Sequence, residues 1–138
     1  MSRVRGRDTR PEIRLRRALY AAGLRYRLHV KDLPGRPDVV FFRARLAIFV
    51  HGCFWHRHPN CEHTRTPKTR LDFWEPKFAD NVKRDKRRQM ELTAAGWTVI
   101  TLWECETRDA QLVARFVNMV ATQINAYRKV PAVKMTTI

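Results

Sequence analysis

The sequence predicts a single α/β domain in which a central mixed β-sheet is flanked by helices. Its 138 residues suit one core of moderate size. Hydrophobic residues make up 44% of the chain, which argues against disorder. Segments with helical periodicity alternate with short apolar runs, as in α/β proteins. Because no repeat or linker divides the chain, we expect one domain over residues 1–128 and a loose tail over residues 129–138.

The first helix is predicted from about Pro11 to Ala22. Thr9 and Glu12 have the spacing of a capping box, proline stands in the first turn, and Gly23 follows the end of the segment. The helical periodicity places apolar residues on one face and arginines on the opposite face. This helix therefore has one side for the core and one strongly basic side.

Strands are predicted next. Residues 25–30 form a short strand, and the turn sequence of residues 33–37 then places Asp38 at the head of the apolar run 39–42. A second apolar run, residues 46–50, follows a tight connection. We expect the two runs to pair as an antiparallel hairpin.

The second half of the chain continues the alternation. An irregular loop is expected over residues 51–71, then a helix over about 73–95, a buried strand over 97–103 and a last helix over about 109–127. The apolar face of the last helix consists of Leu112, Val113, Phe116, Val117, Val120 and Ile124.

The charge of the chain predicts a polyanionic partner. There are 28 Lys and Arg residues against 13 Asp and Glu, a formal net charge of +15. Solubility alone needs a net charge of only about 2–8 in a small domain. The basic residues are spread over the whole chain and do not line one amphipathic helix, so nucleic acid is favoured over an anionic membrane.

The sequence shows no sign of export or membrane insertion. No apolar run approaches the roughly 20 residues that span a bilayer, and residues 1–17 are dense in arginine without the apolar stretch of a signal peptide. Three cysteines are too few for a disulfide framework. We expect a cytoplasmic protein without a membrane partner, and take a monomer as the starting assumption.

The cysteines suggest a metal instead. Cys53, His58 and Cys61 lie within nine residues of one loop, and Cys105 follows a predicted strand. Three thiolates and one imidazole form a closed tetrahedral set that suits structural Zn²⁺. His63 is a possible substitute for His58. The alternative is buried cysteines without a ligand and histidines on the surface.

Asp38 is the first candidate for catalysis. A carboxylate at the head of a buried strand costs desolvation energy unless it is paired or bound to metal, although it can also simply cap a turn. The hairpin should bring Asp38 near Val50 and His51. A carboxylate, a backbone carbonyl and an imidazole can together hold Mg²⁺ against a phosphate and supply a base for water.

Two histidines flank a pair of aromatic residues in the loop. A single histidine is more often structural than catalytic, but His51 and His56 lie close together beside a carboxylate, which makes a base plausible. Phe54 and Trp55 are either core anchors or wedges that enter a base stack. We expect at least one of the two to be exposed.

Several unusual strings occur in a fixed order along the chain. They are Leu33-Pro-Gly-Arg-Pro-Asp38, His51-Gly-Cys-Phe-Trp-His56, Pro67-Lys-Thr, Phe73-Trp74, Asn81-Val82 with Arg84-Asp85, Gly96-Trp97, and Trp103-Glu104-Cys105. Together these strings resemble the very short patch repair endonuclease family. The resemblance covers about residues 1–116. It implies a restriction-endonuclease-like core and an enzyme that nicks DNA 5′ to the thymine of a T:G mismatch, the product of deaminated 5-methylcytosine.

The same resemblance implies roles for single residues. Asp38 and the carbonyl of Val50 would hold Mg²⁺, and His56 would be the general base. His51 would contact the phosphate and the leaving oxygen, while Glu12 and Asp85 would be supporting acids.

The resemblance also implies a role for the irregular loop that begins at His51. The zinc ligands would be Cys53, His58, Cys61 and Cys105, and Phe54, Trp55 and Met1 would intercalate beside the mismatch. Mismatch-repair proteins are possible partners. Two alternatives stay open: a zinc-stabilised DNA-binding module without catalysis, and a related nuclease with another DNA specificity.

Overall fold

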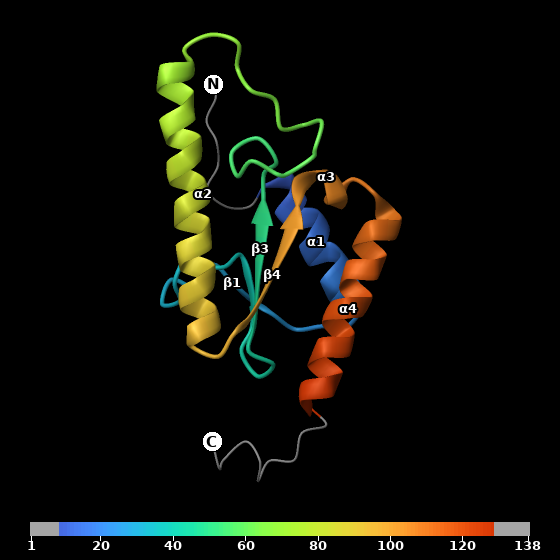
Figure 1. The fold of residues 1–138 in the computed structure, drawn as a ribbon. Coiled ribbons are helices and arrows are strands. Elements are labelled where there is room, and N and C mark those ends of the chain that lie inside the picture. The colour runs from blue at the N-terminus through green and yellow to red at the C-terminus, as the bar shows by residue number, and fades with distance from the viewer. Residues whose placement is uncertain (1–8, 129–138) are drawn as a thin grey trace.

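The computed structural model describes residues 9–128, and Figure 1 shows how their helices and strands are arranged. In chain order the elements are α1 (Arg10–Ala21), β1 (Arg27–Leu28), β2 (Val39–Phe41), β3 (Leu46–His51), α2 (Leu71–Ala94), β4 (Thr98–Trp103), α3 (Glu104–Thr107) and α4 (Ala110–Arg128). The predicted tail at residues 129–138, and Met1, lie outside the described residues.

The four strands form one mixed sheet in the order β1-β2-β3-β4. β1 and β2 are antiparallel, and so are β2 and β3, which form the predicted hairpin. β4 is parallel to β3, because α2 carries the chain back to the starting end of the sheet. The α/β class and the mixed sheet are therefore confirmed.

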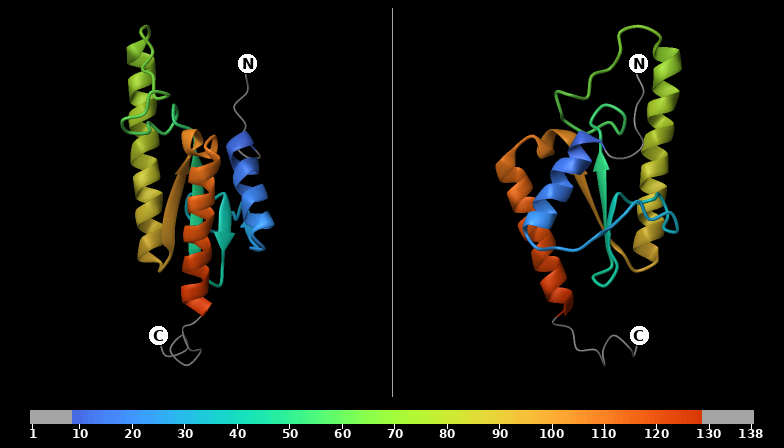
Figure 2. Two further views of the ribbon diagram at one scale, coloured as in Figure 1. Left: turned by 90° about the vertical axis from the view of Figure 1, so that its right-hand side faces the viewer. Right: turned by 180° about the vertical axis from the view of Figure 1, so that it is seen from behind.

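Helices cover both faces of the sheet, as the two views of Figure 2 show, with α2 on one side and α1 and α4 on the other. The strands supply alternate residues to two cores. The larger core joins α1 and α4 to the sheet through Leu15, Leu19, Val39, Phe41, Leu46, Ile48, Leu102, Val113, Phe116, Val117, Val120 and Ile124. The smaller core, under α2, contains Val40, Ala47, Phe49, Leu92 and Trp97.

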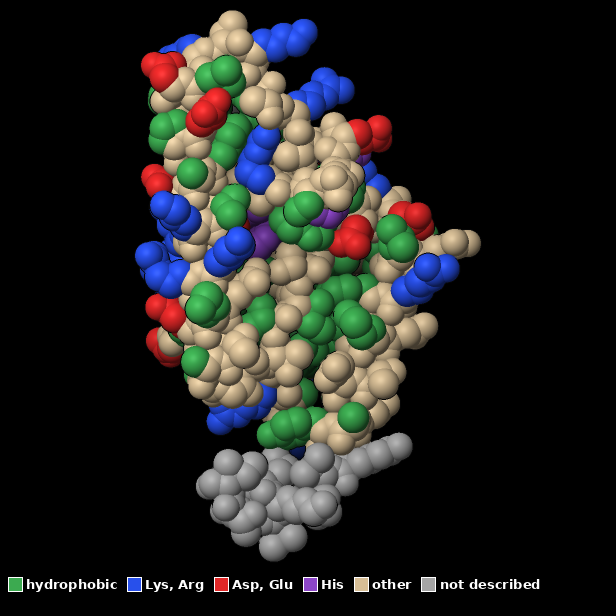
Figure 3. All heavy atoms as spheres, viewed as in Figure 1, with side chains coloured by type: hydrophobic (Ala, Val, Ile, Leu, Met, Phe, Trp, Pro, Cys, Tyr) green, Lys and Arg blue, Asp and Glu red, His purple; other side chains and the backbone are tan. Residues whose placement is uncertain are grey.

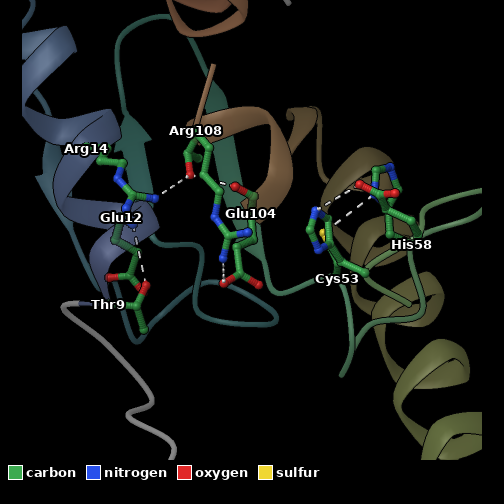
Figure 4. A network of polar contacts seen from close by, with 10 residues as sticks. Thr9, Glu12, Arg14, Cys53, His58, Glu104 and Arg108 are labelled. Carbon is green, nitrogen blue, oxygen red and sulfur yellow. Dashed lines mark hydrogen bonds and ion pairs between the residues drawn. The ribbon is translucent and has the colours of Figure 1, made fainter. Parts of the chain in front are cut away.

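The start of α1 follows from its capping residue. The Thr9 hydroxyl accepts a hydrogen bond from the Glu12 N–H at 3.4 Å, as Figure 4 shows. Pro11 needs no hydrogen-bond donor in the first turn. Because Leu15 and Leu19 are fully buried against the sheet, this cap also fixes where Glu12 lies, one turn before the core begins.

One expectation about burial was wrong. The segment predicted as a buried strand is β4, which lies at the edge of the described sheet; Thr98 is exposed and within β4 only Leu102 is buried. On α4, five of the six residues on the predicted apolar face are buried, and Leu112, at the margin of that face, is 36% exposed. Within residues 9–128, no helix is long and apolar enough to cross a membrane.

Candidate active site and metal centre

One cavity of about 610 Å³ collects all the residues that the sequence predicted for catalysis. It opens where β3 ends, between α1, the loop after β3 and α2. Its lining includes Glu12, Asp38, Val50, His51, His56 and Asp85. The structure therefore brings together five acid and imidazole side chains from positions up to 73 residues apart in the sequence.

Asp38 is held at the head of β2 by β3. Its backbone N–H donates to the Ile48 carbonyl at 3.0 Å, and its Oδ2 accepts the Val50 N–H at 2.7 Å. The N–H and carbonyl of one strand residue point to the same neighbouring strand. The Val50 carbonyl therefore points to the side on which Asp38 lies.

The surroundings of Asp38 disfavour its negative charge. Burial raises the pKa of this carboxyl from 3.8 to about 7; the nearby Glu12 carboxyl also raises it, while the Val50 N–H and Arg16 lower it. A divalent cation would relieve this penalty. Carboxylate and carbonyl oxygens are the ligands that Mg²⁺ prefers, so the donors present fit this ion.

His51, His56 and Asp85 form a second part of the site. The rings of His51 and His56 are stacked, with centroids 3.9 Å apart and planes 7° apart. His56 Nδ1 lies 2.6 Å from Asp85 Oδ2, a short bond between an imidazole and a carboxylate from α2. Burial, followed by the proximity of His56, lowers the pKa of His51 from 6.5 to about 4. His51 is therefore neutral near pH 7.

The site contains two residues that the sequence did not suggest. Arg16 Nη2 lies 3.0 Å from Glu12 Oε2 and 3.1 Å from His29 Nε2, and His29 Nε2 lies 4.0 Å from the same oxygen. Arg16 lies one helical turn after Glu12, and side chains of opposite charge pair at this spacing, so the sequence could have predicted this contact. His29 follows β1, and only the pairing of β1 with β2 brings it to Asp38.

A metal centre is formed by the four predicted ligands. One donor atom each from Cys53, His58, Cys61 and Cys105 lies within 4.8 Å of the others. His58 Nδ1 is 3.6 Å from Cys53 Sγ, a pair drawn in Figure 4, and 3.5 Å from Cys105 Sγ. A tetrahedral Zn²⁺ with ordinary bond lengths places nitrogen and sulfur about 3.6 Å apart. The donors present therefore fit zinc.

The sulfur atoms of this cluster favour a cation. Burial, followed by the adjacent Cys53 thiol, raises the pKa of the Cys105 thiol to about 12. Only a bound cation makes three neighbouring thiolates stable near pH 7. His63, the possible substitute ligand, lies outside the cluster; its side chain is 45% exposed and faces Glu62 at 3.9 Å.

The loop that carries the cluster is folded against α2 by aromatic residues. Phe54 contacts Trp55, Trp74 and Phe78, with ring centroids 5.1 to 5.9 Å apart. Phe54 and Trp55 are both half-buried, so the expectation that at least one of them is exposed was wrong. Sequence reasoning missed the partner surface, because α2 was not known to lie over this loop.

Basic side chains lie at the edge of the cavity and along α2. Figure 3 shows Lys and Arg side chains over α2 and next to histidine side chains that reach the surface. Exposed residues of this kind on the middle of α2 are Lys77, Lys83, Arg84, Lys86 and Arg87, and Arg36 and Arg88 line the cavity itself. The cavity thus combines acids and imidazoles inside with positive charge at its edge.

The sequence is similar to known DNA-nicking enzymes. The profile of the family described as DNA mismatch endonuclease Vsr matches residues 1–63. The type II nicking enzyme V.XorIIP of Xanthomonas oryzae pv. oryzae is 50% identical over 120 residues, which cover 86% of this chain and 88% of the relative. The DNA mismatch endonuclease Vsr of Escherichia coli is 44% identical over 108 residues, 78% of this chain and 69% of the relative.

A third relative is similar over most of this chain. The type II nicking enzyme V.NmeAIP of Neisseria meningitidis is 35% identical over 124 residues, which cover 90% of this chain and 88% of the relative. All three similarities extend well beyond the residues that the family profile matches, and so include the loop and α2. The chain belongs to the Vsr family of endonucleases.

Proposed function

We propose that this chain is a Mg²⁺-dependent endonuclease that nicks duplex DNA 5′ to the thymine of a T:G mismatch. The observation that carries the proposal is the position of His56, between His51 and Asp85, in the cavity that also contains Asp38. The relatives' names, which include a mismatch endonuclease and nicking enzymes, support cleavage of one strand at a mismatch.

His56 is the general base in the proposed reaction. Asp85 holds Nδ1, so Nε2 takes the proton of the attacking water. The water oxygen forms a bond to phosphorus while the bond from phosphorus to the 3′ oxygen breaks. The leaving 3′ oxygen takes a proton from solvent water. The products are a 5′ phosphate on the thymine and a 3′ hydroxyl on the preceding nucleotide. Asp85 stabilises the imidazolium that forms.

His51 has a different role, because its low pKa keeps it neutral. A neutral imidazole cannot be a strong acid, but its N–H can donate a hydrogen bond to the phosphate or to the leaving oxygen. Asp38 and the Val50 carbonyl would hold Mg²⁺, and Glu12 supports Asp38 from α1. When bound, this ion supplies positive charge that stabilises the charge developing on the phosphate.

The zinc centre has a structural role in this proposal. Cys53, His58, Cys61 and Cys105 would bind Zn²⁺ and so fix the loop that carries Phe54, Trp55 and His56. A closed set of four ligands has no position for substrate. The loop has few aliphatic residues for a core of its own, so an ion is a physically reasonable way to stabilise it.

In this proposal the enzyme recognises its DNA substrate by the energy needed to deform the duplex and by the charge of the phosphates. A mispaired step costs less to unstack than a paired one, so Phe54 and Trp55, with Met1 outside the described residues, select the mismatch as wedges. The basic residues around the cavity bind the phosphates of either strand. In this proposal the enzyme acts as a monomer on cytoplasmic DNA, and mismatch-repair proteins are its partners.

The test is strand cleavage of a labelled duplex with one T:G mismatch, beside a T:A duplex of the same sequence. Wild type and Asp38→Ala are compared with Mg²⁺ and with EDTA. We expect a nick confined to the thymine strand of the mismatched duplex, lost in EDTA and in the variant. Mismatch binding without any nick would instead support the non-catalytic DNA-binding module.

A second candidate is nicking at another DNA site, and the names of the type II nicking relatives favour it. Such an enzyme would share the chemistry of the cavity and differ in the contacts made by the loop. A panel of duplexes with other mismatches, with none, and with varied flanking sequence separates the two. Equal rates on matched and T:G duplexes would favour this second candidate.

A further inference from the structure

The donor group formed by Glu12, His29 and Asp38 lies beside the proposed magnesium site. One ligand atom from each residue lies within 4.8 Å of the other two, which is the spacing of a metal site. Glu12 is 3% exposed, and its carboxyl is close enough to Asp38 to raise the pKa of the Asp38 carboxyl. Two buried carboxyl groups and an imidazole at this spacing would ordinarily attract a divalent ion.

A guanidinium group stands at this position. Arg16 Nη2 is hydrogen-bonded to Glu12 Oε2 at 3.0 Å and to His29 Nε2 at 3.1 Å, so one nitrogen joins two of the three donors. The side chain of Arg16 is only 16% exposed. A guanidinium group stays positively charged even where it is buried, because its charge is delocalised over three nitrogen atoms.

His29 is built to hold this guanidinium. Arginine can only donate hydrogen bonds, so in this contact His29 Nε2 is the acceptor, which assigns the ring the tautomer with its hydrogen on Nδ1. The backbone of His29 has a positive φ of 48°, which residues other than glycine rarely adopt. Its N–H donates to the Asp38 carbonyl at 3.3 Å, which ties this conformation to the head of β2.

We propose that Arg16, positioned by His29, is a built-in cation that fills the Glu12–His29–Asp38 donor group, so that this group does not take a divalent ion of its own. This inference rests on the proposed function, because the gained ion is counted relative to the Mg²⁺ that Asp38 and the Val50 carbonyl would hold. Arg16 is a positioning residue here: it neutralises and orients Glu12 and does not contact the reacting phosphate.

The inference predicts a gain of binding when the guanidinium is removed. Arg16→Met keeps an unbranched side chain but removes the guanidinium charge from the three donors. We expect the number of Mn²⁺ ions bound per zinc-loaded chain, counted from the electron paramagnetic resonance signal of free Mn²⁺, to rise by one relative to wild type. Arg16→Lys, which keeps the positive charge, is the matched control and should bind the same number of ions as wild type.

Further variants assign each ion. Adding Glu12→Gln to Arg16→Met should remove the gained ion, and Asp38→Asn in the wild type should remove the ion of the proposed magnesium site. Circular dichroism and a melting curve establish that each variant is folded. Should Arg16→Met not fold, Arg16→Ala removes the same charge and leaves room for an ion and its waters.

The outcomes separate this inference from the proposed function. A wild type that binds no Mn²⁺, together with an Arg16→Met chain that binds one, would contradict the magnesium site and support the built-in cation. An equal number of ions in wild type and in the folded Arg16 variants, whether none, one or two, would overturn the built-in cation. Gain of an ion in Arg16→Lys as well would overturn it too, since charge would then not be the cause.

Discussion

The imidazole rings of His51 and His56 are stacked 3.9 Å apart, with their planes only 7° from parallel. Two imidazolium ions at this distance would repel each other strongly in a partly buried cavity. Burial, followed by this proximity, places the pKa of His51 near 4, while Asp85 lies 2.6 Å from Nδ1 of His56. His51 therefore stays neutral, whereas a protonated His56 has Asp85 as its counter-ion.

Replacing His56 should slow DNA cleavage strongly without weakening DNA binding. We expect His56→Ala to lower the single-turnover nicking rate by about 10²–10⁴-fold, the usual contribution of a general base. Asp85→Asn should cause a smaller loss, because the imidazole remains. The exposed His63 offers a matched control, and His63→Ala should nick at the wild-type rate. Wild-type rates in His56→Ala would show that another group activates the water.

The low pKa of His51 makes a prediction about stability and pH. The unfolded chain binds a proton at His51 below about pH 6.5, whereas the folded chain binds it only below about pH 4. Between these values the unfolded state holds more protons, so the free energy of unfolding falls as the pH falls. The expected loss is on the order of 3 kcal/mol between pH 6.5 and 4, taking about 1.4 kcal/mol per pH unit.

Urea denaturation of wild type and His51→Asn at several pH values between 7 and 4.5 measures this loss. Other groups, including the zinc ligands, also bind protons in this range, so the informative quantity is the difference between the two proteins. The variant should lose less free energy of unfolding than wild type as the pH falls. Parallel curves would mean that His51 already carries a proton in the folded protein near pH 6.5.

Zinc removal should unfold the loop and reduce stability. Cys105→Ser replaces a thiolate ligand by a hydroxyl, which binds zinc poorly, and the same centre also includes Cys53 and Cys61. We expect less than half of the zinc content of wild type and a melting temperature lower by several degrees, since a structural site contributes directly to folding energy. Full zinc content in Cys105→Ser would exclude Cys105 as a ligand; His63→Ala should keep its zinc.

Most of the fold could be predicted from periodicity and turn chemistry. The hairpin of β2 and β3 followed from two apolar runs around a short connection, and the end of α2 from a glycine. The edge position of β4 could not be predicted, because a strand of alternating large residues has the same pattern at an edge as in the centre. The burial of β4 depends on whether another strand lies beyond it in the sheet, and a single sequence does not show this.

The site was predictable where its residues are close in sequence. The zinc ligands and the pair His51 and His56 lie in one loop, and Asp38 follows a recognisable turn. His29 was missed because its role depends on the pairing of β1, a strand of two exposed residues with little pattern. Half-burial of Phe54 and Trp55 was missed because it depends on contacts with α2, which lies more than fifteen residues further along the chain.

DNA binding should depend steeply on salt, and the residues responsible should lie on α2. Arg84 is exposed and adjacent to Asp85, and it contacts Asn81, whose side chain donates to the Trp55 carbonyl at 3.2 Å. A phosphate contact at this position releases about one counter-ion, so Arg84→Ala should reduce the slope of log K against log salt by about 1. Because a phosphate contact carries no sequence information, affinity should fall equally for T:G and T:A duplexes.

Arg115 is the control for this measurement. It is exposed as well, but it lies on α4, on the opposite side of the sheet from α2. Arg115→Ala removes the same charge from the chain and should leave the slope unchanged if binding is local to the cavity. Equal effects of the two variants would mean that the net charge of +15 attracts DNA without a defined binding face. A loss in Arg84→Ala that is confined to the T:G duplex would instead place Arg84 in mismatch recognition, acting through Asn81 on the loop of Trp55.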